Sequence, residues 1–568
     1  MRKFFACALL LFALMYGAAE LTLERPPADG VVRLRWATDP NPARNVQTEI
    51  FGKLQVRLKD SDVLDWDALA RALAKPQAAL ARFAPLAASR GNTTDRPALL
   101  RAINEHLDRP DLFDGVDLSD LDLSHDARLL LKRKDDDEDL TNVEVAALNR
   151  RILEAALPRV IRKARRIEVT VESGAREKLL VQCATGIGPD IIDVYGKNQM
   201  MTYVSAGILV DLTPFAAKMG FGPEHTYPAL TGGLVVDGRQ WRFPCNVWAN
   251  CVIYNRRIFD DHDVAYPKPG WTFDDFVAAG KRIVAGPGRS GEKHLAVAHF
   301  SPVWMYNDLL TGLGGRYFTP DGLASRLDGK EGLRAMKLYH DLMHVHKVIP
   351  TPAEAAAMSS QGGWATGAIA WFSSQRAAMI LIGRWYLCQV VQYPETRKHL
   401  AAVQLPGIDG RASSGVTDAR GAGINVNSPH RDDALKFIQY LAGRDYGQVI
   451  VNDGDSLPPN PNLARNGRDL VNDIVPDPNF HQPFVDAVGP ARPLDASPFI
   501  DGEQIDRWVL ETLQKVENRL LGPEDAVRAL AAEINRRIRT NLRRRIDLQR
   551  KFEQVTGRKY SDDWQRPR

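Results

Sequence analysis

Short apolar strands alternate with amphipathic helices through most of the chain after about residue 165, and this alternation limits the possible folds more than any other feature. Strand-like segments include "RRIEVTVES" (165–173), "PDIIDVYG" (189–196) and "HLAVAHF" (294–300). Helical patterns between them include "AREKLLVQCATG" (175–186) and "WTFDDFVAAGKRIVA" (271–285), the second with Thr272 as its predicted N-cap. Such alternation is typical of α/β domains with mostly parallel sheets and helices on both faces. A length of 568 residues favours two such domains rather than one.

A Leu/Ala-rich helical stretch at about 52–158 interrupts this order soon after the first strand, "VVRLRWA" (31–37). Its acidic turns contain four aspartates that are spaced like calcium ligands: Asp114, Asp117, Asp120 and Asp122. However, the glycine and the closing glutamate of an EF-hand loop are not at the required positions. We therefore predict an inserted helical subdomain with an acidic, solvated face.

The N-terminal residues "MRKFFACALLLFALMYGAAE" have the order of a secretory signal peptide, with a cleavage position after Ala19. An uncleaved anchor helix is the alternative, although the apolar run is shorter than the ~20 residues that usually span a bilayer. Cys7 lies too early in this run to be a lipid attachment site. We expect a soluble mature protein in the periplasm or outside the cell.

The net charge argues against nucleic-acid binding, and the cysteine spacing argues against a disulfide between Cys245 and Cys251. A net charge of +4, from 74 basic and 70 acidic residues, gives no basic field that favours nucleic acid. Cys245 and Cys251 are about 20 Å apart if they share a strand that rises ~3.3 Å per residue, which is too far for a disulfide. We expect four buried free thiols in the mature chain, at Cys183, Cys245, Cys251 and Cys388.

The segment "FPCNVWANCVIYN" (243–255) is predicted to be a strand with two unlike faces. Side chains alternate along a strand, so Asn246, Trp248 and Asn250 share one face. Apolar side chains and Cys251 occupy the other face, which is typical of a core. The first face requires partners for two amides and an indole.

The sequence contains no recognisable catalytic or metal-binding motif. It lacks a phosphate-binding glycine loop, a nucleophile elbow and a zinc-type cluster. His340 and His344 are spaced i, i+4 on one predicted helix, but no third ligand is indicated. We therefore expect no catalytic residues, no metal and no cofactor.

Tryptophan placement is more informative, because none of the eleven lies between residues 67 and 240. Several of the later ones are predicted at strand ends or in loops: Trp248, Trp304, Trp364, Trp371 and Trp385. Ligands of open α/β sheets bind beyond the carboxyl ends of strands. Aromatic faces there suit the apolar face of a sugar ring, while amides and charges suit its hydroxyl groups. For any single tryptophan, packing in a core is the alternative.

Five segments, in order, resemble the extracellular solute-binding proteins of carbohydrate ABC importers, the family that contains maltose-binding protein. They are "GIGPDIIDVYGKNQMMTYVSAGILVDLTPF", "GRQWRFPCNVWANCVIYNRRIF" with "PKPGWTFDDFVAAGKRI", "AAMILIGRW", "GAGINVNSPHRDDALKFIQYLAG" and "PEDAVRALAAEINRRI". The resemblance covers roughly residues 160–545 and the first strand. It implies a two-lobe periplasmic-binding-protein-like fold (type II) with a cleft between the lobes, in which 243–255 is the first crossover strand.

The resemblance also implies a division of the chain into lobes. The predicted parts are the signal peptide (1–19), lobe 1 (30–51, 159–245 and 406–475), the helical insertion (52–158), lobe 2 (246–405 and 476–545) and a basic tail (546–568). The insertion and the tail are departures from the family pattern.

Matched position by position, the resemblance implies a set of ligand-binding residues. They are Trp36, Asp39, Tyr195, Lys197, Asn246, Trp248, Trp304, Tyr306, Arg384, Trp385, Asp418 and Arg420. Each of them has a structural or surface role as its alternative.

The implied function is capture of a carbohydrate between hinged lobes, followed by delivery to the transmembrane permease of an ABC importer, by a protein that we expect to be a monomer. Three alternatives remain at this point. Lys197, Arg384 and Arg420 suit an anionic solute such as an acidic sugar or a phosphodiester. The carboxylates of Asp39, Asp193 and Asp418 suggest a glycan-active enzyme as another alternative, although no catalytic spacing is evident. The protein can also report to a sensor rather than a transporter.

Overall fold

The computed structural model describes residues 31–41, 43–54, 63–64, 107–114, 118–119, 121–136, 140–156, 161–162, 166–173, 176–358, 367–562 and 564. The predicted signal peptide, most of the predicted insertion and Trp364 lie outside these residues. The chain divides into two compact units. One comprises Met1–Arg35 and Asn45–Val171, and the other comprises Trp36–Arg44 and Glu172–Arg568.

The described part of the smaller unit is largely helical. α6 (His125–Asp135) begins at Ser124, whose hydroxyl accepts a hydrogen bond from the backbone N–H of Ala127. α7 (Asn142–Ala156) packs on α6, and Arg133 pairs with Glu144 at 2.7 Å. The other elements that this unit contains, wholly or mostly, are β1 (Val31–Ala37), α2 (Ala43–Leu54), β2 (Val63–Leu64), β3 (Ile161–Arg162) and β4 (Arg166–Glu172), of which β2 and β3 pair antiparallel.

A five-stranded sheet has the order β4-β1-β5-β13-β8. Its strands are β4 (Arg166–Glu172), β1 (Val31–Ala37), β5 (Ile191–Tyr195), β13 (Thr417–Ile424) and β8 (Phe243–Ala249). All eight residues of β13 are buried, since this strand is hydrogen-bonded to a neighbour on each side and α20 packs on it. We call this sheet, with the helices that pack on it, the first lobe.

A four-stranded sheet, all of whose strands belong to the larger unit, has the order β10-β11-β9-β12. Its strands are β10 (Leu295–His299), β11 (Ala377–Ile382), β9 (Cys251–Asn255) and β12 (Leu400–Gln404). α13 (Phe273–Val284) packs on β10 and begins with a capping box in which Thr272 and Asp275 bond reciprocally, which confirms Thr272 as the N-cap. We call this sheet and its helices the second lobe.

The chain crosses between the two sheets through strands that change partners. β8 pairs with β13 in the first lobe, and after a single residue, Asn250, β9 pairs with β11 and β12 in the second lobe. The return passes from β12 to β13. The predicted single strand 243–255 is therefore two strands with a break at Asn250, and the prediction that it crosses between lobes is confirmed.

The expectation of mostly parallel sheets is wrong for the described pairings. β1 pairs parallel with β5, and β10 pairs parallel with β11. The crossover strands run against their neighbours, so β13 is antiparallel to β5 and β8, and β9 is antiparallel to β11 and β12. The chain leaves the first sheet through β8 and returns to it through the adjacent strand β13, so these two strands must run in opposite directions. The alternation of strands and helices in the sequence does not reveal this strand direction.

The remaining helices of the larger unit cover the two sheets and the segments between them. Those that follow β4 and precede β8 are α8 (Arg176–Ala184), α9 (Lys197–Ser205), α10 (Thr213–Met219), η2 (Pro223–His225), η3 (Pro228–Leu230) and α11 (Thr231–Leu234), with the hairpin β6 (Val235–Val236) and β7 (Arg239–Gln240). Those between β9 and β12 are α12 (Arg256–Asp261), α14 (Pro302–Gly312), α15 (Lys330–His344), α16 (Pro352–Met358), α17 (Ala368–Ser373), η4 (Arg384–Tyr386), α18 (Leu387–Val390) and α19 (Pro394–Arg397). After β13 come α20 (Arg431–Ala442), α21 (Arg444–Asp453), η5 (Pro461–Leu463), η6 (Gly467–Leu470) and α22 (Pro478–Val488).

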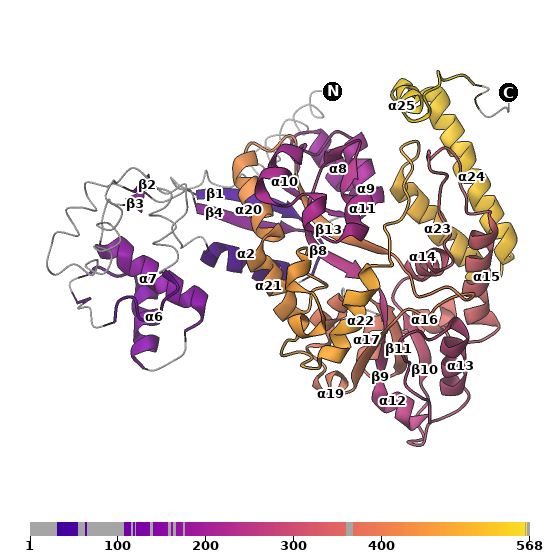
Figure 1. The fold of residues 1–568 in the computed structure, drawn as a ribbon, viewed down its shortest axis with the longest axis horizontal. Helices are drawn as coiled ribbons and strands as arrows, with labels where there is room; N and C mark the ends of the chain where they lie inside the picture. Colours follow the sequence, from indigo (N-terminus) through magenta and orange to yellow (C-terminus); the bar gives the residue numbers. More distant parts are fainter. Residues whose placement is uncertain are drawn as a thin grey trace, which may run out of the picture. The chain divides into compact units, whose positions relative to one another are not determined.

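Three helices end the chain: α23 (Gly502–Glu517), α24 (Pro523–Arg544) and α25 (Ile546–Thr556), which Figure 1 draws in orange to yellow. The buried stripes of α23 and α24 join the core of the second lobe. α25 lies in the predicted basic tail, and its Phe552 packs against Tyr560 and Trp564. The described residues of the tail therefore pack against the second lobe.

Two further expectations from the sequence concern cysteines and membranes. The four described cysteines are free thiols, of which Cys183, Cys245 and Cys251 are buried and Cys388 is half-buried. Among the described helices, none combines the length and the apolar character that crossing a bilayer requires.

Candidate functional site

A cleft of about 560 Å³ lies where the two crossover strands meet the first turns of α9 and α14. Its volume is in the range of small-molecule binding sites. Both lobes and the N-terminal half of α23 contribute to it. The lining residues are Asp39, Asn41, Arg44, Tyr195, Gly196, Lys197, Asn198, Gln199, Asn246, Trp248, Asn250, Phe300, Ser301, Val303, Trp304, Asn307, Trp385, Val416, Asp418, Arg420, Asp455, Ser456, Leu494, Glu503, Asp506, Arg507 and Leu510.

One wall of the cleft is aromatic. Trp248 on β8 stacks on Trp304 with ring centroids 5.1 Å apart and planes 8° from parallel. Phe300 and Trp385 meet Trp304 edge-on, at 5.4 and 6.3 Å. A centroid distance of 5.1 Å leaves no room for a sugar ring between the two stacked indoles, so a ligand must lie against their outer faces and edges.

The positions of Trp304 and Trp385 follow from their local sequence. Ser301 caps α14 and Pro302 occupies its first turn, so Trp304 lies in a helix immediately after β10. Trp385 lies in η4, immediately after β11. These tryptophans were predicted in loops, which is wrong, but they do lie beyond the carboxyl ends of parallel strands, as expected.

Two asparagine side chains at the first crossover have polar atoms without a hydrogen-bond partner among the described residues. Asn250 donates a hydrogen bond to Asp308 Oδ2 at 2.8 Å, while its Oδ1 is buried and accepts none among the described residues. The Asn246 side chain also makes no hydrogen bond with the described residues, although the residue is buried, with only 4 % of its surface exposed. The Asn246 side chain and Asn250 Oδ1 are therefore the polar groups of this strand face that still require hydrogen-bond partners.

Asp308 connects the two crossovers, and its raised pKa makes the stability of the folded protein depend on pH. Its carboxylate accepts from Asn250 next to β9 and from the backbone N–H of Val416, next to β13, at 2.9 Å. Burial raises the pKa of Asp308 to about 6, from an ordinary value of 3.8. Between these values the folded protein holds a proton that the unfolded chain has released, so this group lowers the free energy of unfolding as the pH rises through the window.

We therefore expect Asp308→Asn to become more stable relative to the native chain as the pH is raised from about 4 to about 7. Each pKa unit corresponds to ~1.4 kcal/mol, so the relative gain is about 2 kcal/mol. Urea unfolding of both proteins at the two pH values measures it. Burial also raises the pKa of Asp453 to about 6, but this group titrates equally in both proteins and cancels. A stability difference that does not change with pH would contradict the assignment.

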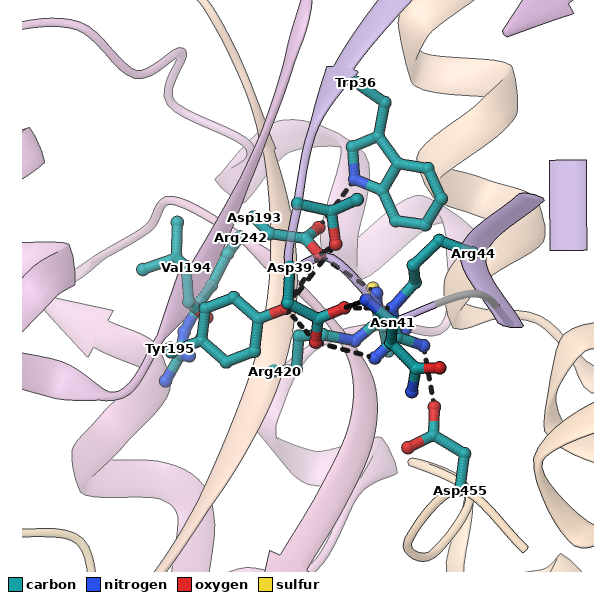
Figure 2. A network of polar contacts seen from close by, with 12 residues as sticks. Trp36, Asp39, Asn41, Arg44, Asp193, Val194, Tyr195, Arg242, Arg420 and Asp455 are labelled. Carbon is teal, nitrogen blue, oxygen red and sulfur yellow. Dashed lines mark hydrogen bonds and ion pairs between the residues drawn. The ribbon is translucent and has the colours of Figure 1, made fainter. Parts of the chain in front are cut away.

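A second part of the cleft lining belongs to a buried charge network (Figure 2). Arg44 pairs with Asp39 through two bonds of 3.0 Å and with Asp455 at 2.7 Å. Tyr195 donates its hydroxyl to Asp39 Oδ2 at 2.8 Å. Burial favours the neutral acid, but the Arg44 guanidinium outweighs it and lowers the pKa of Asp39 to about 2. Asp39 is therefore ionised at neutral pH and accepts hydrogen bonds through both carboxylate oxygens.

Two further arginines of the network are neutralised inside the first lobe. Arg420 pairs with Asp193 at 2.9 Å and donates to the hydroxyl of Tyr446. Asp418 pairs with Arg242 at 2.6 Å and accepts from the backbone N–H of Lys197 at 3.1 Å, which caps α9. The Lys197 ammonium itself has no hydrogen bond or ion pair among the described residues.

Nine of the twelve predicted ligand-binding residues line this cleft: Asp39, Tyr195, Lys197, Asn246, Trp248, Trp304, Trp385, Asp418 and Arg420. Their contact with a ligand remains a proposal. The other three, Trp36, Tyr306 and Arg384, do not line it and need correction.

Each of these three residues has a structural role. Trp36 is fully buried, donates to Asp193 at 2.8 Å and packs on Phe437. Tyr306 is fully buried in the core of the second lobe. Arg384 is 1 % exposed and donates to four backbone carbonyl groups, of Ile450, Val451, Ser456 and Leu470. Its neighbour Trp385 faces the cleft instead.

Sequence reasoning missed the contribution of α23. Glu503, Asp506, Arg507 and Leu510 line the cleft and follow the i, i+3, i+4, i+7 spacing of one helix face. This spacing can be seen in the sequence, but a polar face of a helix is ordinarily exposed to solvent, so it did not indicate a binding site. Arg44 and Asp455 were also missed, because only the fold brings residues that far apart in sequence together.

The model of the bacterial extracellular solute-binding protein family matches residues 153–448, which is more than half of the chain. The chain belongs to this family. The resemblance noted in the sequence is thereby confirmed. Solved sugar-binding proteins share the fold of this solute-binding protein. A Listeria monocytogenes ABC substrate-binding protein in complex with cycloalternan has a TM-score of 0.55 and 22 % identity, covering 65 % of this chain and 91 % of that one. For maltose-bound MalE3 of T. maritima the TM-score is 0.54 and the identity 18 %, with the same coverage.

Two curated relatives come from Streptomyces. The diacetylchitobiose binding protein DasA of Streptomyces coelicolor is 22 % identical over 367 residues, which cover 60 % of this chain and 81 % of DasA. An uncharacterized lipoprotein encoded in the oleD 5' region of Streptomyces antibioticus is 25 % identical over 290 residues, or 50 % of this chain. The match spans 60 % of that lipoprotein's length. The two-lobe type II fold predicted from the sequence is confirmed.

Proposed function

We propose that this solute-binding protein captures a carbohydrate in the cleft and delivers it, as a monomer, to the permease of an ABC importer outside the cytoplasm. The aromatic wall carries this proposal, because the indoles of Trp304 and Trp385 offer faces and edges to the apolar side of a sugar ring. Asn246 and the free Oδ1 of Asn250 stand beside that wall as partners for hydroxyl groups.

The charges of the cleft favour a neutral sugar over an anion. Arg384 lies outside the cleft, while Arg420 and Arg44 are already paired with buried carboxylates. A bound anion would have to compete with these pairs. The proteins solved with maltose and cycloalternan, and the relative named for diacetylchitobiose, bind uncharged saccharides. Lys197 is the observation that keeps an acidic sugar as the second candidate.

The arrangement of the cleft also favours a protein that binds its ligand without catalysing a reaction on it. A glycosidase needs one carboxyl group that is protonated at working pH, and the low pKa of Asp39 makes it unsuited to this role. The crossovers at Asn250 and between β12 and β13 give the lobes a hinge. A ligand that contacts both lobes stabilises the closed arrangement only through contacts that improve on closure. The permease then recognises the closed form.

Thermal unfolding of the mature chain, beginning at Glu20, against neutral and acidic mono- and oligosaccharides tests this function. A ligand at 100 times its dissociation constant adds about 2.7 kcal/mol to the free energy of unfolding. We expect a neutral oligosaccharide to raise the unfolding temperature in both the native chain and Lys197→Gln. A shift produced only by acidic sugars and lost in Lys197→Gln would favour the second candidate. No shift with any saccharide would contradict a carbohydrate receptor.

A further inference from the structure

A cluster of metal-ligating side chains lies in the second lobe, where α12 ends. Asp261 is the last residue of α12, His262 is its C-cap, and His294 directly precedes β10. One ligand-type atom of each lies within 4.8 Å of the others. His262 Nε2 and His294 Nδ1 are 3.0 Å apart, and the two residues are 6 % and 8 % exposed.

The distance between the two ring nitrogens suits a shared ion. Nitrogen ligands bind zinc at about 2.1 Å, so two of them lie roughly 3.0 to 3.4 Å apart at ligand angles from a right angle to the tetrahedral value. The same distance also allows a hydrogen bond between two imidazoles, which is the competing explanation.

The groups around the cluster favour the ion. Ser290 donates its backbone N–H and its hydroxyl to the two oxygens of Asp261, at 2.7 and 2.8 Å, which fixes the carboxylate. Glu292 Oε2 lies 3.6 Å from His294 Nε2, on the side of the ring away from His262. Ligating histidines commonly have a carboxylate at the second nitrogen. A hydrogen bond between two imidazoles would require neither feature.

The loop that supplies these groups is built to close over Asp261. At Gly288, a β-carbon would lie 1.9 Å from Asp261 Oδ2, so only glycine fits there. Gly291 has a φ of +83°, which turns the chain back toward His294. The backbone N–H of Arg289 donates to the Asp261 carbonyl at 2.8 Å.

Topology places the cluster away from the sugar cleft. β10 and β11 run parallel, and β9 runs antiparallel to β11, so the end of β9 and the start of β10 share one sheet edge. The cluster lies at this edge. Trp304 and Trp385 follow the other ends of β10 and β11. An ion here would join α12 to the 288–294 loop and act on stability rather than on ligand recognition.

We propose that Asp261, His262 and His294 bind a zinc ion that ties the end of α12 to the start of β10. The Asp261 carboxylate, His262 Nε2 and His294 Nδ1 are the protein ligands, and water completes the coordination. Binding only to the folded protein raises its stability by mass action.

Calorimetric titration of the metal-free full chain, prepared without an affinity tag, with zinc chloride tests this site. We expect one ion per chain, a higher unfolding temperature with zinc, and at least a tenfold loss of affinity in His294→Ala and in Asp261→Asn. The Asp261→Asn variant keeps the side-chain shape and the histidine pair, so it reports ligation even if His294→Ala fails to fold. Cobalt(II) gives a second readout, because its visible spectrum reports coordination by imidazole nitrogen.

The matched control is the double variant His340→Ala/His344→Ala. These two rings also lie close together, with centroids 4.9 Å apart on α15, and they are not part of the proposed site. Zinc affinity should be unchanged in this variant. Zinc binding that is lost there and retained in Asp261→Asn, or the absence of any zinc binding to the native chain, would overturn the proposal.

Discussion

Arg242→Met is expected to lower the free energy of unfolding by about 3–5 kcal/mol, because it leaves the buried Asp418 carboxylate without its partner. Arg242 is fully buried, and it donates to Asp418 at 2.6 Å and to the carbonyls of Val194 and Gly233 at 2.8 and 2.7 Å. Urea unfolding measures the loss. The pair joins α11, β5 and β13, so it holds together strands that contribute residues to the cleft.

The matched control for this prediction is Arg334→Met. Arg334 also pairs with an aspartate through two hydrogen bonds, to Asp409 at 3.0 and 2.9 Å, but the two side chains are 40 % and 46 % exposed. A solvated pair contributes at most ~1 kcal/mol. Adding Asp418→Asn to Arg242→Met should recover part of the lost stability, because no unpaired charge then remains buried. Equal losses for the two arginine variants would refute the role given to Arg242.

Trp304→Ala is expected to weaken sugar binding by roughly 30-fold or more. Truncating an aromatic side chain at the centre of a binding site commonly costs about 2 kcal/mol or more, and each 1.4 kcal/mol is a factor of ten in affinity. Trp304 contacts Trp248, Phe300 and Trp385, so its loss also removes the packing that holds the rest of the aromatic wall. Isothermal titration with the sugar that raises the unfolding temperature measures the effect.

Trp371→Ala is the control for that variant. Trp371 lies on α17 in the same lobe, where it contacts the Arg376 guanidinium, and it is not part of the cleft lining. Its removal should leave the affinity unchanged, and Trp304→Phe should retain most of it. Native affinity in Trp304→Ala would show that the sugar binds elsewhere.

The fold and the hinge were largely predictable from the sequence. Strand–helix alternation, the unlike faces of 243–255 and the order of five family segments all pointed to two α/β lobes. The direction of the crossover strands was not predictable, because periodicity carries no information on which neighbour a strand pairs with. The placement of Trp248, Trp304 and Trp385 was predictable, since strand ends and Trp residues were both visible.

One of the errors concerns two residues that follow one another at the end of a strand. Arg384 and Trp385 are adjacent, yet one is enclosed by backbone carbonyl groups and the other faces the cleft. A 3-10 turn decides which side chain points where, and the sequence gives no sign of it. Likewise, Arg420, which suggested an anionic ligand, is neutralised by Asp193, a residue distant in sequence.

The most direct test of the account is the crystal structure of this protein with the saccharide that raises its unfolding temperature. We expect the sugar in the cleft, with a ring against Trp304 or Trp385 and hydroxyl groups within hydrogen-bond distance of Asn246 and of Asn250 Oδ1. An empty cleft, with the saccharide bound at another surface under conditions where calorimetry shows saturation, would contradict the central claim.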